Sequence, residues 1–87
     1  MMADKAQVSR LIKTARGQLD GILKMIEDDR YCLDISNQLM ATEAILNRAN
    51  KEVLRAHMKG CVQRAVEHGD ADKEIDEMIG VIDKLSK

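Results

Sequence analysis

The feature that most constrains this 87-residue chain is a stretch from about residue 33 to 68 that contains no proline and keeps helical periodicity throughout. Its stripe recurs at three- and four-residue spacing: Ile35, Leu39, Thr42, Leu46, Ala49, Val53, and then positions 56–57 and 60–61. A helix of that length spans roughly 54 Å, whereas a compact monomer of this size has a radius of gyration of about 12 Å. We therefore expect an obligate oligomer built on antiparallel helix pairs, provided that the helix is unbroken at Gly60.

Two shorter amphipathic segments flank the long one. Asp4, with Gln7 three residues later, suits a capping box at the start of a helix over about residues 5–28. The apolar positions of this first helix are Val8, Leu11, Ile12, Ala15, Leu19, Ile22 and Ile26. His68-Gly69 predicts the end of the long helix, and Asp70 or Asp72 can cap a third helix over about 72–86. The sequence thus predicts an all-α fold, with a single domain of three helices over residues 1–87.

The composition excludes several classes of protein. Hydrophobic residues make up 45% of the chain, which is too many for a disordered protein, yet no run approaches 18 consecutive apolar residues. The N-terminus lacks the apolar core of a signal peptide, so we expect a cytoplasmic protein without a membrane partner. No pairing of nucleophile and base, phosphate loop or acidic cleft is evident, so we do not expect an enzyme.

The charges are unevenly distributed along the chain. Residues 1–19 carry four basic groups against one acidic group, and residues 48–64 carry five against one. The two remaining segments, 20–47 and 65–87, are each net −4. The basic segments could form one positive face for nucleic acid, although ordinary solvated helix faces would give the same pattern.

The soft metal ligands of the chain are Cys32, His57 and Cys61. His57 and Cys61 are four residues apart, so on a helix they share a face and can bind the same atom. Cys32 lies about 37 Å away from His57 along a straight helix, so one chain cannot bring all three together. An antiparallel dimer can, because Cys32 of one subunit then meets His57 and Cys61 of the other. Such a dimer has two equivalent sites, each shared between subunits.

Two thiolates and one imidazole form a soft, three-coordinate set. Such a set selects Cu(I) and, less sharply, Zn(II), although structural zinc sites usually have four protein ligands. A cysteine or histidine within a helix is also commonly an ordinary core residue, which leaves a purely structural interpretation open. We interpret Met25, Met40, Met58 and Met78 as core residues rather than as a methionine-rich copper site.

Together these residues resemble the copper-sensing operon repressors (CsoR) of the CsoR/RcnR group of metal-sensitive transcriptional repressors. The resemblance covers nearly the whole chain. It rests on Arg16-Gly17-Gln18, Gly21-Ile22, Met25-Ile26-Glu27, Tyr31-Cys32-x-Asp34, Asn37-Gln38 and His57-x-x-x-Cys61-Val62. The Cys, His, Cys spacing is the fingerprint of the copper-sensing subgroup, since nickel sensors replace the last Cys with His and persulfide sensors lose the His.

The resemblance implies an antiparallel four-helix-bundle dimer that assembles into a dimer-of-dimers tetramer. It implies one Cu(I) per subunit at the intersubunit site of Cys32, His57 and Cys61. The metal-free protein would bind operator double-stranded DNA and dissociate when Cu(I) binds, which derepresses copper-export genes. Tyr31 and Glu77 match the pair that hydrogen-bonds the metal-bound histidine in this family.

We expect phosphate contacts from the basic residues of the two positive segments, to which Gln18 can contribute. These basic residues are Lys5, Arg10, Lys13, Arg16 and Arg48. The family usually carries a consecutive basic pair before the Arg-Gly-Gln motif, and here that stretch reads Lys13-Thr14. One expected positive charge is therefore missing from the DNA-binding face.

Two other functions fit the same residues. The first is a thiol-based sensor of sulfane sulfur or oxidants, in which Cys32 and Cys61 form an intersubunit couple; such a switch does not need His57. The second is a helical copper store or chaperone without DNA binding, which the basic segments disfavour.

Overall fold

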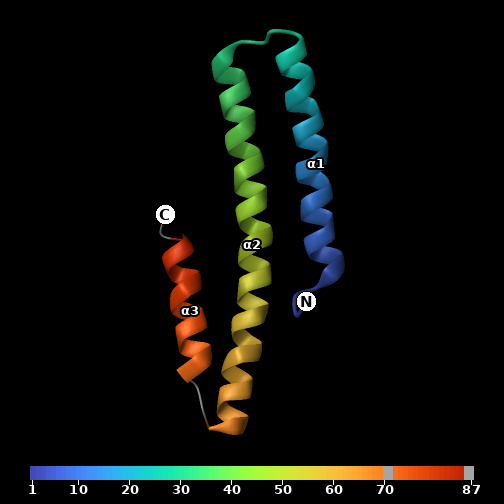
Figure 1. The fold of residues 1–87 in the computed structure, drawn as a ribbon. Helices are drawn as coiled ribbons and strands as arrows, with labels where there is room; N and C mark the ends of the chain where they lie inside the picture. The colour runs from blue at the N-terminus through green and yellow to red at the C-terminus, as the bar shows by residue number, and fades with distance from the viewer. Residues whose placement is uncertain (70–71, 86–87) are drawn as a thin grey trace.

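The computed structural model describes residues 1–69 and 72–85, and within them the chain forms three α-helices and no strand (Figure 1). They are α1 (Lys5–Glu27), α2 (Cys32–His68) and α3 (Asp72–Leu85). The all-α prediction is confirmed. Asp72 is the first residue of α3, whereas Asp70, the other predicted cap, and residue 86, the predicted end of that helix, lie outside the described residues.

The first two helices form an antiparallel hairpin. Asp4 caps α1, because its carboxylate accepts hydrogen bonds from the backbone N–H groups of Ala6 and Gln7 at 2.9 and 3.2 Å. At the other end Asp29 adopts a left-handed conformation with φ of 51°, and the Arg30 N–H donates to the carbonyl of Met25 at 3.0 Å. This tight turn leads directly into α2. As a result, α1 runs antiparallel to α2 and packs on the N-terminal part of that helix (Figure 1).

The long helix α2 is continuous through Gly60, which was the condition for the predicted oligomer. It ends at Gly69, whose φ of 71° suits glycine and whose N–H donates to Ala65 O at 2.8 Å. The molecule measures 58 × 28 × 12 Å, and its radius of gyration is 17.5 Å. These dimensions describe a flat rod rather than a compact monomer.

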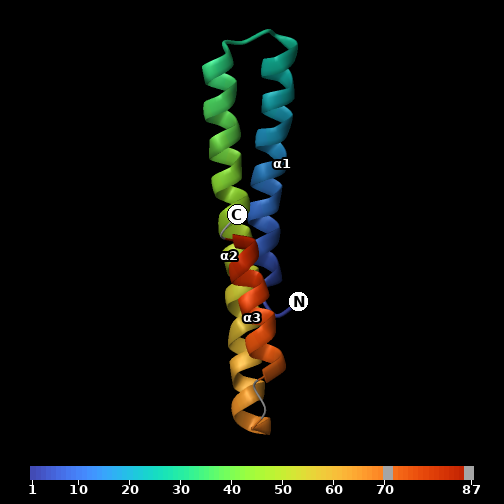
Figure 2. The ribbon, with the colours of Figure 1, turned by 60° about the vertical axis from the view of Figure 1, so that its left-hand side comes forward.

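The protomer has a very small core. Among the residues whose burial the structure describes, those that it buries are Ala15, Ile22, Thr42, Ala49, Gly60 and Cys61. Much of the predicted apolar stripe stays open to solvent, since Leu39 and Leu46 are each 43% exposed. The reason is geometric: α1 covers only one side of α2 and α3 is short, so one protomer cannot cover the remaining apolar surface (Figure 2).

The exposed apolar side chains continue on the other two helices. They are Ile12, Leu19, Leu23 and Ile26 on α1, and Ile75, Ile79 and Ile82 on α3. Large apolar side chains left exposed on all three helices indicate surface that a partner covers. Among the described residues, no helix is both long enough and apolar enough to cross a membrane.

Candidate metal centre

The C-terminal half of α2 and the middle of α3 bring three possible metal ligands together. One ligand atom each of His57, Cys61 and Glu77 lies within 4.8 Å of the other two. His57 and Cys61 share a face of α2 because they are one turn apart, and α3 runs antiparallel to α2 so that Glu77 comes alongside them. This cluster joins two helices that follow one another in the sequence.

The histidine ring is oriented by a direct contact with α3. Its Nε2 lies 2.6 Å from Glu77 Oε1, with the two side chains 39% and 45% exposed. A carboxylate at this distance favours the tautomer that carries its proton on Nε2, which leaves Nδ1 with a free lone pair. The contact therefore prepares Nδ1 of His57 as the ring nitrogen that can bind a metal.

The Cys61 sulfur is fully buried and has a partner that the sequence did not reveal. Arg64 Nη2 donates a hydrogen bond to Cys61 Sγ at 3.2 Å. This bond, together with the charge of Cys61, raises the pKa of the Arg64 guanidinium, and the charges of Glu74 and Glu77 act in the same direction. The signal that could have identified Arg64 is its spacing, three residues after Cys61 on the same helical face.

Cys32 and Tyr31 lie at the opposite end of α2. Cys32 is the first residue of that helix and is exposed, and Tyr31 immediately precedes it with 66% of its surface exposed. The 25 residues between Cys32 and His57 correspond to about 37 Å of helix. Within one chain the structure thus brings together His57, Cys61 and Glu77, and leaves the other two predicted site residues far from them (Figure 1).

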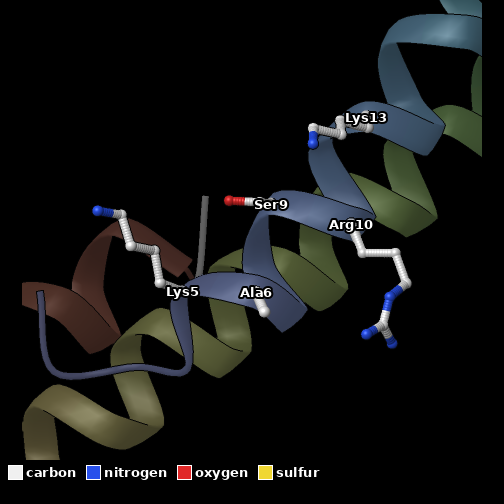
Figure 3. A pocket seen from close by; sticks show the side chains of 5 residues that line it. All are labelled: Lys5, Ala6, Ser9, Arg10 and Lys13. Carbon is white, nitrogen blue, oxygen red and sulfur yellow. The ribbon is translucent and has the colours of Figure 1, made fainter.

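The N-terminal part of α1 carries a basic surface. Lys5, Arg10 and Lys13 line a shallow hollow of about 600 Å³ with Ala6 and Ser9. In Figure 3, Lys5, Ser9 and Lys13 project from one side of α1 and Arg10 projects from the other. All three basic side chains are exposed, which suits contacts with an extended anionic partner.

The other predicted DNA-contacting residues lie in different environments. Arg16 on α1 and Arg48 on α2 are exposed. Gln18 is half-buried, and its Oε1 lies 2.8 Å from Thr42 Oγ1, so its side chain faces α2. Thr14, which stands where a basic residue was expected, donates its hydroxyl proton to Arg10 O at 3.0 Å.

Comparison with known proteins gives a consistent result. The sequence model of the family described as metal-sensitive transcriptional repressor matches residues 4–84. A copper-sensing transcriptional repressor CsoR from Mycobacterium ulcerans is 45% identical over 78 residues, which cover 90% of this chain and 66% of the relative. This chain therefore spans about two thirds of the length of that relative.

Two solved structures share the fold. The copper-sensing repressor CsoR with Cu(I) from Geobacillus thermodenitrificans superposes with a TM-score of 0.85 and 31% identity, over 100% of this chain and 94% of the other. The nickel-responsive transcriptional regulator InrS superposes with a TM-score of 0.86 at 23% identity, over 97% of this chain and 94% of the other. At this identity the second likeness concerns the fold alone.

Proposed function

Because the chain belongs to the metal-sensitive transcriptional repressor family, we propose that it is a Cu(I)-responsive repressor, which holds operator DNA when metal-free and releases it when Cu(I) binds. The matched family consists of transcriptional repressors and not of enzymes. The choice of metal rests on the ligand set of this chain, and the intersubunit arrangement rests on where α2 places those ligands.

The observation that carries the proposal is that His57 and Cys61 lie together on α2 while Glu77 contacts Nε2 of the His57 ring. Cys61 supplies a thiolate and His57 supplies Nδ1, and Cys32 is the second cysteine of the chain. Two thiolates and an imidazole favour Cu(I), which accepts three-coordinate soft sites, over nickel, which favours more imidazole and carboxylate. Glu77 acts as the hydrogen-bonding partner that orients the histidine.

The geometry of α2 explains how the third ligand can reach the site. On a helix of 3.6 residues per turn, Cys32 points within about 20° of both His57 and Cys61, on the same side of α2. A second α2 packed antiparallel on that side would bring the partner's Cys32 to His57 and Cys61 and give two equivalent sites. The partner's Tyr31 would arrive beside the same histidine.

This alignment also places the twofold axis. If Cys32 faces a point between His57 and Cys61, the axis passes close to Leu46, and Leu39 faces Val53 of the second copy. Leu39 and Leu46 are the two large residues of the α2 stripe that a single protomer leaves exposed. The dimer is therefore an antiparallel four-helix bundle of two α1–α2 hairpins, and two dimers form the tetramer.

The DNA-contacting surface is formed by the basic residues of α1 with Arg48 of α2. Lys5, Lys13 and Arg16 follow one face of α1 at spacings of eight and three residues, and Arg10 extends from the other side of the helix. Each chain contributes few such charges, so a tetramer multiplies contacts that are individually weak. Gln18 contributes by its hydrogen bond to Thr42, which holds α1 on α2 beneath this surface.

The alternative functions are not favoured. A dithiol sensor of sulfane sulfur or oxidants needs neither His57 nor the Glu77 contact, and a copper store needs no basic surface on α1. The matched relative and the matched copper-bound structure are both copper-sensing repressors. We therefore keep these alternatives only as outcomes of the decisive experiment.

That experiment is an anaerobic Cu(I) titration against a competing chelator, followed in parallel by fluorescence anisotropy of the protein's own promoter DNA. We expect one Cu(I) per subunit and release of DNA at the same equivalence point. Tight copper binding with DNA still held would contradict the repressor mechanism. Weak copper binding, combined with DNA release by polysulfide, would instead support the dithiol sensor.

A further inference from the structure

A positive charge lies directly against the candidate metal site, outside the ligand set. The Arg64 guanidinium donates to the sulfur of Cys61 at 3.2 Å, although the arginine itself is solvent-exposed and the sulfur is fully buried. Arg64 also lines a hollow of about 340 Å³ together with His57, His68, Lys73, Glu74 and Glu77. Its cation therefore shares this hollow with His57 and also hydrogen-bonds the sulfur of Cys61.

Groups on two helices hold this cation in place. On α2 the hydrogen bond to Cys61 fixes one end of the guanidinium, and on α3 the carboxylates of Glu74 and Glu77 attract it. An arginine guanidinium carries its positive charge at every pH that the protein encounters. A permanent charge at hydrogen-bond distance from a ligand atom must affect which ion binds there.

We propose that Arg64 is a selectivity residue, which favours monovalent Cu(I) over divalent ions at the site of Cys32, His57 and Cys61; this inference rests on the proposed function. Two thiolates and a neutral imidazole leave a single net negative charge around a monovalent ion and none around a divalent one. The Arg64 cation stabilises the first complex by attraction. It gives no such stabilisation to the second and repels the additional positive charge of the ion.

The neighbouring charges on α3 act in both directions. Glu74 and Glu77 partly neutralise Arg64, whereas Lys73 adds a further positive group at the rim of the hollow. Without Arg64, the two carboxylates would face the site uncompensated, which disfavours an anionic complex and favours a divalent ion. Removing the cation should therefore lower the affinity for Cu(I) and leave unchanged or raise the affinity for Zn(II).

The test compares Cu(I) and Zn(II) affinities of the full-length protein by chelator competition, under anaerobic conditions, for three variants. Arg64→Gln removes the charge without introducing a soft ligand, and Arg64→Lys retains it. Arg55→Gln is the matched control, because Arg55 is on the same helix and pairs with Glu52 at 3.7 Å. We expect Arg64→Gln to lower the ratio of Cu(I) to Zn(II) affinity about tenfold, the scale of one charge at the protein surface.

The control Arg55→Gln should leave that ratio unchanged, and Arg64→Lys should restore most of it. An equal loss of affinity for both ions in Arg64→Gln would show that Arg64 only positions Cys61, which would overturn the selectivity role. An unchanged ratio would overturn it as well. Failure of the proposed function is separately visible, because the wild-type protein would then bind Cu(I) without releasing DNA.

Discussion

His57 Nε2 lies 2.6 Å from Glu77 Oε1, and this contact links the long helix to α3 at the candidate metal site. The contact orients the imidazole and assigns its two nitrogens different tasks, one toward the carboxylate and one toward a metal. Since α3 runs alongside the C-terminal half of α2, a movement of the His57 ring can shift α3 directly through this contact.

Substitution of Glu77 by alanine should lower the Cu(I) affinity by about 10- to 100-fold, because the histidine loses the partner that orients it. Glu77→Gln should lose less Cu(I) affinity, since the amide oxygen of Gln can still accept a hydrogen bond from the Nε2–H group of His57. Chelator competition measures both. Asp76→Ala, the neighbouring exposed acidic residue of α3, is the control for a general charge effect. Equal affinities in all four proteins would exclude a role of this contact in metal binding.

Replacement of Cys32 by alanine should abolish the copper response while leaving DNA binding intact. Cys32 is exposed at the start of α2, so its loss should change the free energy of unfolding by no more than about 0.5 kcal/mol. The measurement is promoter binding by anisotropy with and without Cu(I). If this variant still released DNA at one Cu(I) per subunit, Cys32 would not be a ligand.

Leu46→Glu should convert the dimer into monomers. Its side chain is 43% exposed in the protomer, and the proposed twofold axis would bring two such carboxylates face to face in an apolar seam. Sedimentation velocity reports the mass. Val66→Glu provides the matched control, because Val66 is 80% exposed on the same helix and lies away from the seam. A Leu46→Glu protein that kept the mass of the wild-type oligomer would refute the proposed alignment of the two helices.

Thr42→Val should destabilise the α1–α2 hairpin by about 1 kcal/mol, the net contribution of a typical hydrogen bond. Thr42 is 3% exposed, and its hydroxyl shares one proton between Gln18 Oε1 at 2.8 Å and Gln38 O at 3.1 Å. Valine keeps the shape and removes the donor. Urea unfolding at one fixed protein concentration measures the loss, and an unchanged midpoint would show that the Gln18 contact contributes no stability.

Lys13→Gln should weaken promoter binding. It should also reduce the slope of log binding constant against log salt concentration by about one for each lysine that contacts a phosphate. Lys24→Gln, near the other end of α1, is the charge-matched control. Conversely, Thr14→Lys should strengthen DNA binding, because it restores the second charge of the basic pair. Salt-dependent anisotropy measures all three variants. The same salt slope for Lys13→Gln and the wild type would remove Lys13 from the DNA-contacting surface.

Local sequence signals accounted for most of the fold. The three helices follow from periodicity, from the Asp4 cap and from Gly69, since each of these acts over one or two helical turns. The continuity of α2 through Gly60 was a condition that periodicity alone could not guarantee, because a glycine within a helix costs about 1 kcal/mol. The structure shows that the helix tolerates it, with the Met2 side chain lying where a β-carbon would be.

The candidate site could be predicted only in part. His57 and Cys61 were selected by their four-residue spacing, and Cys32 by its chemistry. Glu77 was selected by resemblance to a family, since no local signal distinguishes it from other carboxylates of α3. Arg64 was not selected, because its role depends on a rotamer that brings its guanidinium to the sulfur.

By itself, the sequence determined that this chain forms long helices, that they leave apolar surface uncovered, and that its soft ligands lie on one side of the longest helix. Periodicity and ligand chemistry are local properties, so they can be read without coordinates. Only the tertiary structure decided that α3 returns to place Glu77 on His57, that Arg64 reaches Cys61, and that Thr42 holds Gln18. These contacts depend on side-chain directions and, for Glu77 and Gln18, on how helices distant in sequence pack together, which no local pattern encodes.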